Sequence, residues 1–547
     1  MCKIPQHCEK KQQIGVKMLK IKFLDKNLKR KSERQEPLKF VIKIPESLIV
    51  FPEVKNKREL NITYPLLEPF SYAHISWSKS EGEFIYRLRE PKLNKKEQKI
   101  FENLKESLIE VVDIKLSSIK KTDKAFDYLE EKIKSILEEI EVRLTNVSYN
   151  KIMYYIYRDF VGLNEIEPLM HDPYIEDISC DGIGVPIYIV HKKLGSIQTN
   201  IVFNDKEKLK NFVVKLAERC GRYISYAEPL LDGSLPDGSR VQASLAEDVT
   251  TKGPTFSIRK FTAEPLSPID LINLKTASPK IMAYLWFCVE SGISMLICGG
   301  TATGKTTMLN AISLFIPSEF KIVSIEDTRE LQLPHENWIP SVARMGFGAM
   351  EPTGEKYGEV TMFDLLKESF RQNPDYVIVG EIRGKEASVM FQGMASGHPS
   401  LGTMHAAGVS TVVKRLQSPP IELSPSLVEV LDMVVTLVHA REKGKSARRI
   451  KSVEEIQSVS SDGTARTSFI FRWVPSKDIF EEGESNYILN KIAHLKGIPL
   501  STIKKEIKKR EKVISWMVKE GITHWKEVSK IVSIYRTNPN EILKKVE

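Results

Sequence analysis

The sequence predicts an α/β fold, and three observations indicate that class. A short apolar segment, residues 294–298, is typical of a buried strand. The segment from residue 306 to 315 carries apolar residues at helical spacing, so a helix should follow the strand directly. From residue 151 onward, further short strand-like segments alternate with helical ones. This alternation is typical of a sheet covered by helices.

Between that strand and that helix lies Gly-Gly-Thr-Ala-Thr-Gly-Lys-Thr-Thr, which matches the phosphate-binding pattern G-x-x-x-x-G-K-[ST]. In this pattern backbone N–H groups surround phosphate oxygens, the lysine reaches the β and γ phosphates, and the hydroxyl of Thr306 ligates Mg²⁺. We therefore expect ATP and Mg²⁺ as ligands. The expected nucleotide-binding residues are Gly299, Gly300, Thr301, Ala302, Thr303, Gly304, Lys305, Thr306 and Thr307.

Length and composition place the chain among ordinary globular proteins. Its 547 residues suggest about three or four domains. The six cysteines are scattered and form no C-x-x-C pair, which fits a reducing cytoplasm better than a disulfide framework. Cys2, His7 and Cys8 lack a second ligand pair at zinc-site spacing. No apolar run reaches the roughly 18 residues of a membrane span, and the start lacks a signal-peptide core.

The formal charge of +10 is concentrated at the N-terminus. Residues 1–34 hold eleven lysines and arginines against three acidic residues, a net charge of +8. Apolar residues recur there at three- and four-residue steps, so a helix would have one apolar stripe flanked by lysines. Such a helix suits an anionic membrane surface or an acidic partner. A solvated, disordered arm fits the same composition, and both interpretations remain open.

Shifts in composition divide the chain into six regions. We expect a basic arm at residues 1–37, disordered or close to a membrane; an accessory β/helical region at 38–150; a smaller α/β domain at 151–262; a hinge linker at 263–277; the phosphate-loop domain at 278–440; and a C-terminal strand and helical region at 441–547. In the smaller domain, Pro236-Asp237-Gly238-Ser239 predicts a tight turn between strands. In the tail, Ser501 is placed to cap a helix that Gly521 ends.

Three strand-like segments downstream of the loop end in polar residues. Residues 376–380 lead to Glu381, residues 323–325 lead to Glu326, and residues 400–404 lead to His405. Parallel strands would bring these three side chains to the same edge of the sheet. A carboxylate at such a position is how phosphate-loop enzymes hold the attacking water beside Mg²⁺.

The order of these motifs resembles that of the type II/type IV secretion ATPases, most closely the archaeal branch with the archaellum motor and the archaeal pilus-assembly ATPases. The motifs are Ile325-Glu326-Asp327, Arg371-Gln372-Asn373-Pro374-Asp375, Gly380-Glu381-Ile382-Arg383, and Gly397-His398 with Thr403-Met404-His405. Upstream, residues 175–182 and 235–241 extend the resemblance, which covers roughly residues 38 to 547. It implies a RecA-like P-loop ATPase domain preceded by a smaller α/β domain, with an N-terminal accessory region and a C-terminal helical tail.

The resemblance also implies roles for individual residues. Glu381 would polarise the attacking water, Glu326 would help to place it, and His405 would sense the γ-phosphate. Arg240 and Arg259 of the preceding domain would neutralise charge on the nucleotide, and Arg371 and Arg344 are further candidates for that role. His398 is interpreted as a loop residue. Many family members have Asp after Gly-Glu-x-Arg where this chain has Gly384, which questions a pairing role for Arg383.

These residues together predict a Mg²⁺-dependent ATPase. The resemblance and the need for arginine fingers imply a ring-shaped homohexamer that lies in the cytoplasm at the inner face of the membrane. By resemblance it would drive a polytopic membrane platform protein and assemble a type IV pilus-like filament, or serve a related secretion. An archaellum motor uses the same catalytic motifs and is the first alternative. A DNA-handling ATPase and a nucleotide-gated scaffold that barely hydrolyses ATP are alternatives of other classes. No specific nucleic acid is expected, because no recognised nucleic-acid-binding motif is present.

Overall fold

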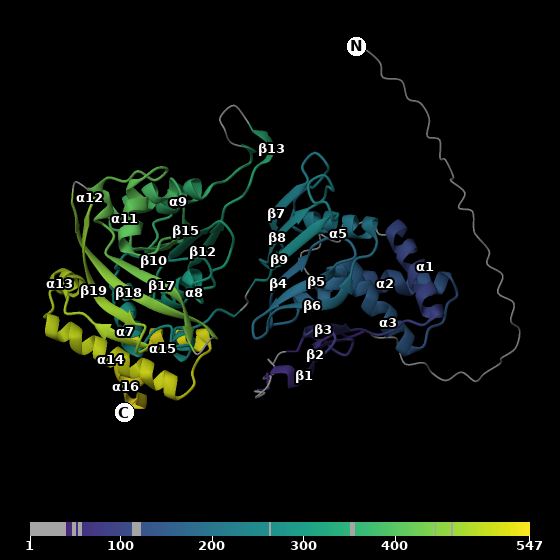
Figure 1. Cartoon of the computed structure of the whole chain (residues 1–547), viewed down its shortest axis with the longest axis horizontal. Helices are drawn as coiled ribbons and strands as arrows, with labels where there is room; N and C mark the ends of the chain where they lie inside the picture. The colour runs from purple at the N-terminus through teal and green to yellow at the C-terminus, as the bar shows by residue number, and fades with distance from the viewer. Residues whose placement is uncertain are drawn as a thin grey trace, which may run out of the picture.

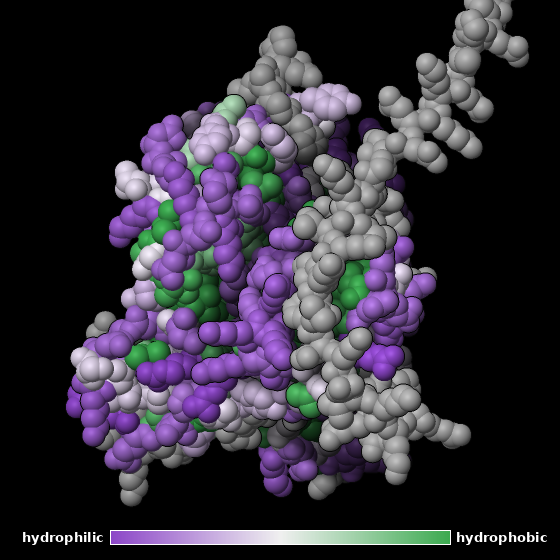
Figure 2. All heavy atoms as spheres, turned by 90° about the vertical axis from the view of Figure 1, so that its right-hand side faces the viewer, coloured by the Kyte–Doolittle hydropathy of each residue, from purple (hydrophilic) through white to green (hydrophobic). Residues whose placement is uncertain are grey.

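The structure is a computed structural model that describes residues 40–45, 51–52, 57–111, 122–261, 264–350, 356–442, 445–460 and 463–546. Its strands form two nine-stranded sheets and one two-stranded hairpin, which confirms the α/β class (Figure 1). The basic arm with Cys2, His7 and Cys8 lies outside these residues. Within the described ranges, no helix is both long and apolar enough to cross a bilayer. The face shown in Figure 2 is mostly hydrophilic, with apolar atoms visible in separate patches.

The first sheet has the strand order β1-β2-β3-β6-β5-β4-β9-β8-β7. Its strands are β1 (Asn61–Leu67), β2 (Ser71–Ser78), β3 (Glu83–Arg89), β4 (Ile175–Cys180), β5 (Pro186–His191), β6 (Gly195–Val202), β7 (Leu230–Ser234), β8 (Arg240–Ser244) and β9 (Thr255–Arg259). A parallel pairing of β3 with β6 joins the expected accessory region to the smaller α/β domain in one sheet. The boundary at residue 150 stays a prediction.

Helices of the N-terminal part pack beside this sheet. They are α1 (Lys95–Val111), α2 (Thr122–Glu139), α3 (Asn146–Ile156), α4 (Glu167–Met170) and α5 (Lys206–Arg219), with a π-helical turn at Tyr157–Val161 and 3₁₀ turns at Lys57–Glu59 and Asn164–Ile166. Asp205 caps α5 by accepting hydrogen bonds from the N–H groups of Glu207 and Lys208. The predicted turn between β7 and β8 is confirmed, since Gly238 has φ +92° and its N–H donates to the carbonyl of Leu235.

The second sheet has the order β12-β11-β15-β16-β10-β17-β18-β19-β20. Its strands are β10 (Met295–Gly299), β11 (Ile322–Glu326), β12 (Trp338–Val342), β15 (Tyr376–Ile382), β16 (Ser400–Met404), β17 (Met433–Glu442), β18 (Lys445–Val459), β19 (Ala465–Val474) and β20 (Ile479–Glu482); the hairpin is β13 (Phe347–Met350) with β14 (Lys356–Tyr357). The six strands from β12 to β17 run parallel, and the last three are antiparallel to their neighbours.

Helices cover both faces of this sheet, as its continuous apolar strands predict. They are α6 (Pro268–Asn273), α7 (Pro279–Glu290), α8 (Lys305–Ser313), α9 (Met362–Arg371), α10 (Glu386–Ala395), α11 (Val409–Gln417), α12 (Pro425–Val428), α13 (Tyr487–Lys496), α14 (Leu500–Lys519), α15 (Trp525–Thr537) and α16 (Pro539–Val546). Ile297 packs in the core with α7, α8 and the C-terminal helices, whereas Leu296 and Cys298 face the core with α10 and α11. Strand β10 is therefore buried on both sides.

The C-terminal helices are fixed to the second sheet by buried polar contacts. Glu455, which is fully buried, accepts hydrogen bonds from the hydroxyls of Tyr284 and Ser485. Arg510 of α14 pairs with Glu290 at 3.1 Å and stacks over the ring of Trp286. One expectation was wrong, because α14 begins at Leu500 after Pro499, so Ser501 lies inside the helix rather than at its cap. Gly521, at φ +70°, follows the end of α14 as predicted.

Candidate functional site

The phosphate-binding loop has the backbone that its glycines permit. The predicted strand and helix are both present, although β10 ends at Gly299 and α8 begins at Lys305, each one residue closer to the loop than expected. Gly304 has φ +90°, a region that glycine enters without steric cost. Gly299 is required for another reason: a Cβ there would lie 2.5 Å from the hydroxyl oxygen of Thr303 and 2.8 Å from the carbonyl of Leu437. The loop is therefore packed against β17 as well as curled over the start of α8.

Lys305 and Thr303 both bond to the loop itself. The Nζ of Lys305 donates to the carbonyl of Gly300 at 3.0 Å, and the hydroxyl of Thr303 donates to the same carbonyl at 2.9 Å. Burial lowers the pKa of the Lys305 amine, although the nearby Glu381 carboxylate opposes that shift. A phosphate group would offer Lys305 a charged acceptor in place of a neutral carbonyl, and charge-assisted hydrogen bonds are the stronger kind.

Lys305, His405 and Glu381 meet at the carboxyl ends of three neighbouring parallel strands, β10, β16 and β15. The Nζ of Lys305 lies 3.3 Å from Nδ1 of His405. The Nε2 of His405 lies 3.2 Å from Oε1 of Glu381 without the angle of a hydrogen bond, so this oxygen has no donor among the described residues. Burial and the charge of Lys305 lower the pKa of His405, which favours a neutral ring that can accept from the lysine.

Glu381 is also paired with Arg383, which answers the question raised by Gly384. The Nη2 of Arg383 donates to Oε2 of Glu381 at 2.5 Å. Oε1 of Glu386 accepts hydrogen bonds from the backbone N–H groups of Arg383 and Gly384. Burial opposes ionisation of Glu381, but the hydrogen bond and charge of Arg383 outweigh it and lower the pKa of this carboxyl. Glu381 is therefore ionised at neutral pH.

Glu326, at the end of β11, is a buried carboxyl beside this group. Its Oε1 accepts from the backbone N–H groups of Glu330 and Leu331 at 2.9 and 3.0 Å, and its Oε2 has no partner among the described residues. A Cβ at Gly380 would lie 3.1 Å from the Cγ of Glu326, so β11 and β15 approach closely at this point. Burial raises the pKa of Glu326 to about 7. A proton can move on or off this group near neutral pH.

The donor set fits Mg²⁺ bound together with phosphate. Among the described residues, no cluster of three or more His, Cys, Asp or Glu side chains could hold a metal by itself. Mg²⁺ in nucleotide sites needs only one or two protein ligands, because phosphate and water supply the others. Thr306 lies in the first turn of α8, directly after Lys305, and could supply its hydroxyl. Thr307 follows it in the same turn.

The candidate arginines of the first sheet lie on neighbouring strands. Arg240 and Arg259 are directly opposite each other in the pairing of β8 with β9. Arg240 pairs with Asp232 at 2.9 Å, and Arg259, with 72% of its side chain exposed, pairs with Asp177 at 3.2 Å. The pair with Asp232 and the charge of Asp327, which follows β11 in the second sheet, raise the pKa of Arg240. Arg240 thus lies within electrostatic reach of the second sheet.

The remaining candidates lie elsewhere in the isolated chain. Arg371 ends α9 and pairs with Glu368 at 3.3 Å, ahead of β15 and so at the opposite end of that strand from Glu381. His398 likewise precedes β16. The centroid of its ring lies 5.2 Å from that of the Phe370 ring. The Nε of Arg344 donates to the carbonyl of Gly358 at 2.8 Å. The structure of one chain does not bring these three residues to the phosphate-binding loop.

Arg448 is a loop contact that sequence reasoning missed. This residue of β18 donates from Nε to the carbonyl of Ala302 at 3.0 Å. Its Cδ would lie 3.3 Å from a Cβ at Gly304. The contact helps to hold Ala302, which has φ +58°. The Arg448-Arg449 pair was visible in the sequence, but it lies more than 140 residues after the loop and belongs to no spaced motif.

Comparisons with known proteins match the chain to related sequences over most of its length. A sequence profile of the family described as "Type II/IV secretion system protein" matches residues 163–529. The protein MJ0900 of Methanocaldococcus jannaschii is 36% identical over 520 residues, which cover 90% of this chain and 92% of that protein. The type IV secretion system protein PtlH of Bordetella pertussis is 34% identical over 266 residues, covering 43% of this chain and 76% of PtlH.

Solved structures give a looser match. The VirB11 ATPase from the Brucella suis type IV secretion system, crystallised with sulphate, is 25% identical. The match covers 53% of this chain and 92% of that one, with a TM-score of 0.27.

Proposed function

Because the chain belongs to the type II/IV secretion system protein family, we propose that it is a Mg²⁺-dependent ATPase that drives a membrane-bound secretion or filament machine. The observation that carries this proposal is the meeting of Lys305, Glu381 and His405 at the ends of three parallel strands. This edge of the sheet combines a phosphate-binding loop, an ionised carboxylate and a neutral imidazole. Such a set is suited to positioning and charge stabilisation, which dominate phosphoryl transfer.

The residues of the loop bind the nucleotide. Backbone N–H groups of residues 299–307 surround the phosphates, and Lys305 leaves the carbonyl of Gly300 for the β and γ phosphates. The hydroxyl of Thr306 would hold Mg²⁺, which when bound neutralises charge on the phosphate oxygens. Arg448 keeps Ala302 in its left-handed conformation, so the loop does not have to reorganise when phosphate binds.

Two carboxyl groups, those of Glu381 and Glu326, position and polarise the attacking water. Oε1 of Glu381 has no hydrogen-bond donor in the part of the chain that the structure describes, so it is available to accept a proton of the attacking water. Arg383 fixes the carboxylate from its other oxygen. Glu326, with a pKa near 7, can take up or release a proton at working pH and supports the placement of Glu381 across the close contact of β11 with β15. His405 links the carboxylate to Lys305 and can transmit the loss of the γ-phosphate.

Hydrolysis would be coupled to movement between the parts of the chain joined by residues 263–277. Arg240 and Arg259 would act as fingers that reach a nucleotide when the two parts close, as a supplied guanidinium is worth 10³ to 10⁵ in rate in related phosphoryl transfers. Supporting this role, Arg240 lies within electrostatic reach of Asp327 in the second sheet. A homohexameric ring would let one subunit's fingers complete another subunit's site.

The machine served would be a type IV pilus-like filament or a related secretion apparatus, driven through a polytopic membrane platform from the cytoplasmic side. The matched secretion proteins support the secretion part of this proposal, and the relative from Methanocaldococcus jannaschii supports an archaeal setting. An archaellum motor would use the same site. Cells carrying Glu381→Gln at the native locus separate the two: lost swimming indicates the archaellum, and lost thin filaments with swimming intact indicate pilus assembly.

The catalytic proposal is tested with purified protein. We expect Glu381→Gln to bind a fluorescent ATP analogue with the affinity of the parent and to hydrolyse ATP at least about 100-fold more slowly. Glu386→Gln is the matched control, since Glu386 begins α10 just after β15 and its carboxylate accepts hydrogen bonds from backbone N–H groups. Near-parental turnover of Glu381→Gln would refute the water-polarising role and transfer it to Glu326. Absence of steady-state turnover in the parent would favour a nucleotide-gated scaffold.

A further inference from the structure

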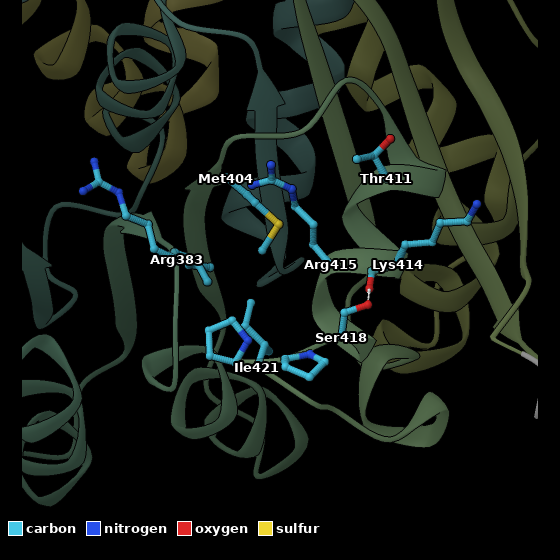
Figure 3. Close-up of a pocket in the computed structure, with 10 residues that line it drawn as sticks. Arg383, Met404, Thr411, Lys414, Arg415, Ser418 and Ile421 are labelled. Atoms are coloured by element: carbon cyan, nitrogen blue, oxygen red, sulfur yellow. Dashed lines mark hydrogen bonds between the residues drawn. The ribbon is translucent and has the colours of Figure 1, made fainter.

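A pocket of about 260 Å³ opens beside the proposed catalytic group, between the ends of β15 and β16 and helix α11 (Figure 3). Ile421 and Met404 contribute to an apolar floor, and the cations Arg383, Lys414 and Arg415 line the rim. Figure 3 shows Arg383 extending from the end of β15 and Arg415 from α11, on either side of Met404 in that view. None of the lining residues is acidic.

Two of the three cations of this pocket lack anionic partners among the described residues. The guanidinium of Arg415 and the ammonium of Lys414 have no hydrogen-bond or ion-pair partner within the described part of the chain. Arg383 has one, since only its Nη2 donates to Glu381. The positive charges of the three cations that line the pocket would attract an anion bound there. Guanidinium groups bind phosphate through paired, charge-assisted hydrogen bonds.

The pocket is coupled to the catalytic residues through its arginines. Arg383 holds Oε2 of Glu381 at 2.5 Å. The charges of Arg383 and Arg415 act on His405, where they add to the effects of burial and Lys305. An anion that binds Arg383 would weaken the hydrogen bond from Arg383 to Glu381, because one guanidinium would then be shared between two anions. The position of the water-polarising carboxylate would therefore depend on whether the pocket is filled.

We propose that this pocket is a second anion site, which binds the phosphate group of a small ligand between Arg383 and Arg415. The proposal rests on the proposed ATPase only for the source of the ligand. Free phosphate is produced at the neighbouring site, whereas the apolar floor at Met404 and Ile421 would suit the organic part of a phosphate ester. Both sources share the phosphate group, and the first experiment distinguishes them.

Binding is measured by calorimetry in a Lys305→Ala background, which needs no ATP hydrolysis. Inorganic phosphate should bind, and adding Arg415→Ala should weaken binding at least about tenfold. Arg466→Ala, which removes an exposed arginine of β19, is the matched control and should leave binding unchanged. Adenosine monophosphate that binds more tightly than phosphate, with the same loss in Arg415→Ala, would identify an organic phosphate. Adenosine monophosphate that binds no more tightly than inorganic phosphate would identify free phosphate as the ligand.

Absence of phosphate binding, or binding that survives Arg415→Ala, would overturn the proposal. Because Arg415 is exposed on α11, its replacement should leave the thermal unfolding of the chain unchanged, and Arg415→Lys offers a variant that keeps the charge. A second measurement uses turnover at saturating ATP with Lys305 intact. Phosphate should reduce kcat in the parent and not in Arg415→Ala, since competition at the loop disappears at saturation. If inhibition by phosphate vanishes at saturating ATP in both the parent and Arg415→Ala, phosphate binds only at the phosphate-binding loop.

Discussion

Glu326 gives the sharpest quantitative test of the site. Its carboxyl is 1% exposed, and burial raises its pKa from 4.5 to about 7. Below pH 4.5 the group is protonated in both the folded and the unfolded chain, so it costs nothing. As the pH rises from 4.5 to 7 the unfolded chain ionises first, and the folded state loses stability. Above pH 7 the loss is complete at about 3 kcal/mol.

Glu326→Gln should remove this penalty without changing the shape of the side chain. Its carbonyl oxygen can still accept from the N–H groups of Glu330 and Leu331. An amide N–H group at the unpartnered Oε2 position costs stability, but this cost does not vary with pH. Relative to the parent, the variant should therefore gain about 3 kcal/mol in the free energy of unfolding between pH 4 and pH 8.5.

The assay is urea unfolding without nucleotide, followed by tryptophan fluorescence. All the tryptophans except Trp77 lie after residue 285, and Trp338 donates to Ser324 of β11, next to the strand end that carries Glu326. Glu336→Gln removes an exposed carboxylate that precedes β12, and it should show no such pH-dependent gain. If the difference between Glu326→Gln and the parent stays constant from pH 4 to 8.5, Glu326 has an ordinary pKa and its assignment as a buried, neutral-pH acid is refuted.

Two further predictions concern the arginine fingers and the loop. Mixing Arg240→Ala chains with Lys305→Ala chains should restore part of the ATPase activity. The reason is that a mixed ring contains sites with an intact loop and an intact arginine finger from a neighbouring subunit. Steady-state rates of the mixture that equal those of the separate variants would mean that subunits do not share sites. Gly299→Ala should destabilise the chain by about 1–3 kcal/mol and abolish nucleotide binding, since its Cβ would meet atoms of Thr303 and Leu437. Gly300→Ala is the matched control, because the nearest atom to its Cβ would be 3.9 Å away, and equal losses of stability and binding in both variants would contradict the packing argument.

Local sequence determined much of the fold and the centre of the site. The strand before the loop, helix α8 and the turn at Gly238 were all predictable, because their signals lie within a few neighbouring residues: apolar runs, helical spacing, and glycines where φ is positive. The meeting of Lys305, Glu381 and His405 followed from a general rule that parallel strands end at one edge of their sheet. Those predictions needed no knowledge of distant contacts.

Only the tertiary structure decided which groups pair at that edge. The sequence shows that Arg383 lacks a following acid, but not that it turns back onto Glu381, since a side chain's direction depends on the space left by its neighbours. It shows Glu326 as an acid at a strand end, but not that both faces of β11 are buried deeply enough to raise its pKa. Arg448 reaches the loop, and β3 joins β6, through contacts between residues more than 100 positions apart. Packing between distant segments sets distances and burial, and these quantities govern charge and reactivity.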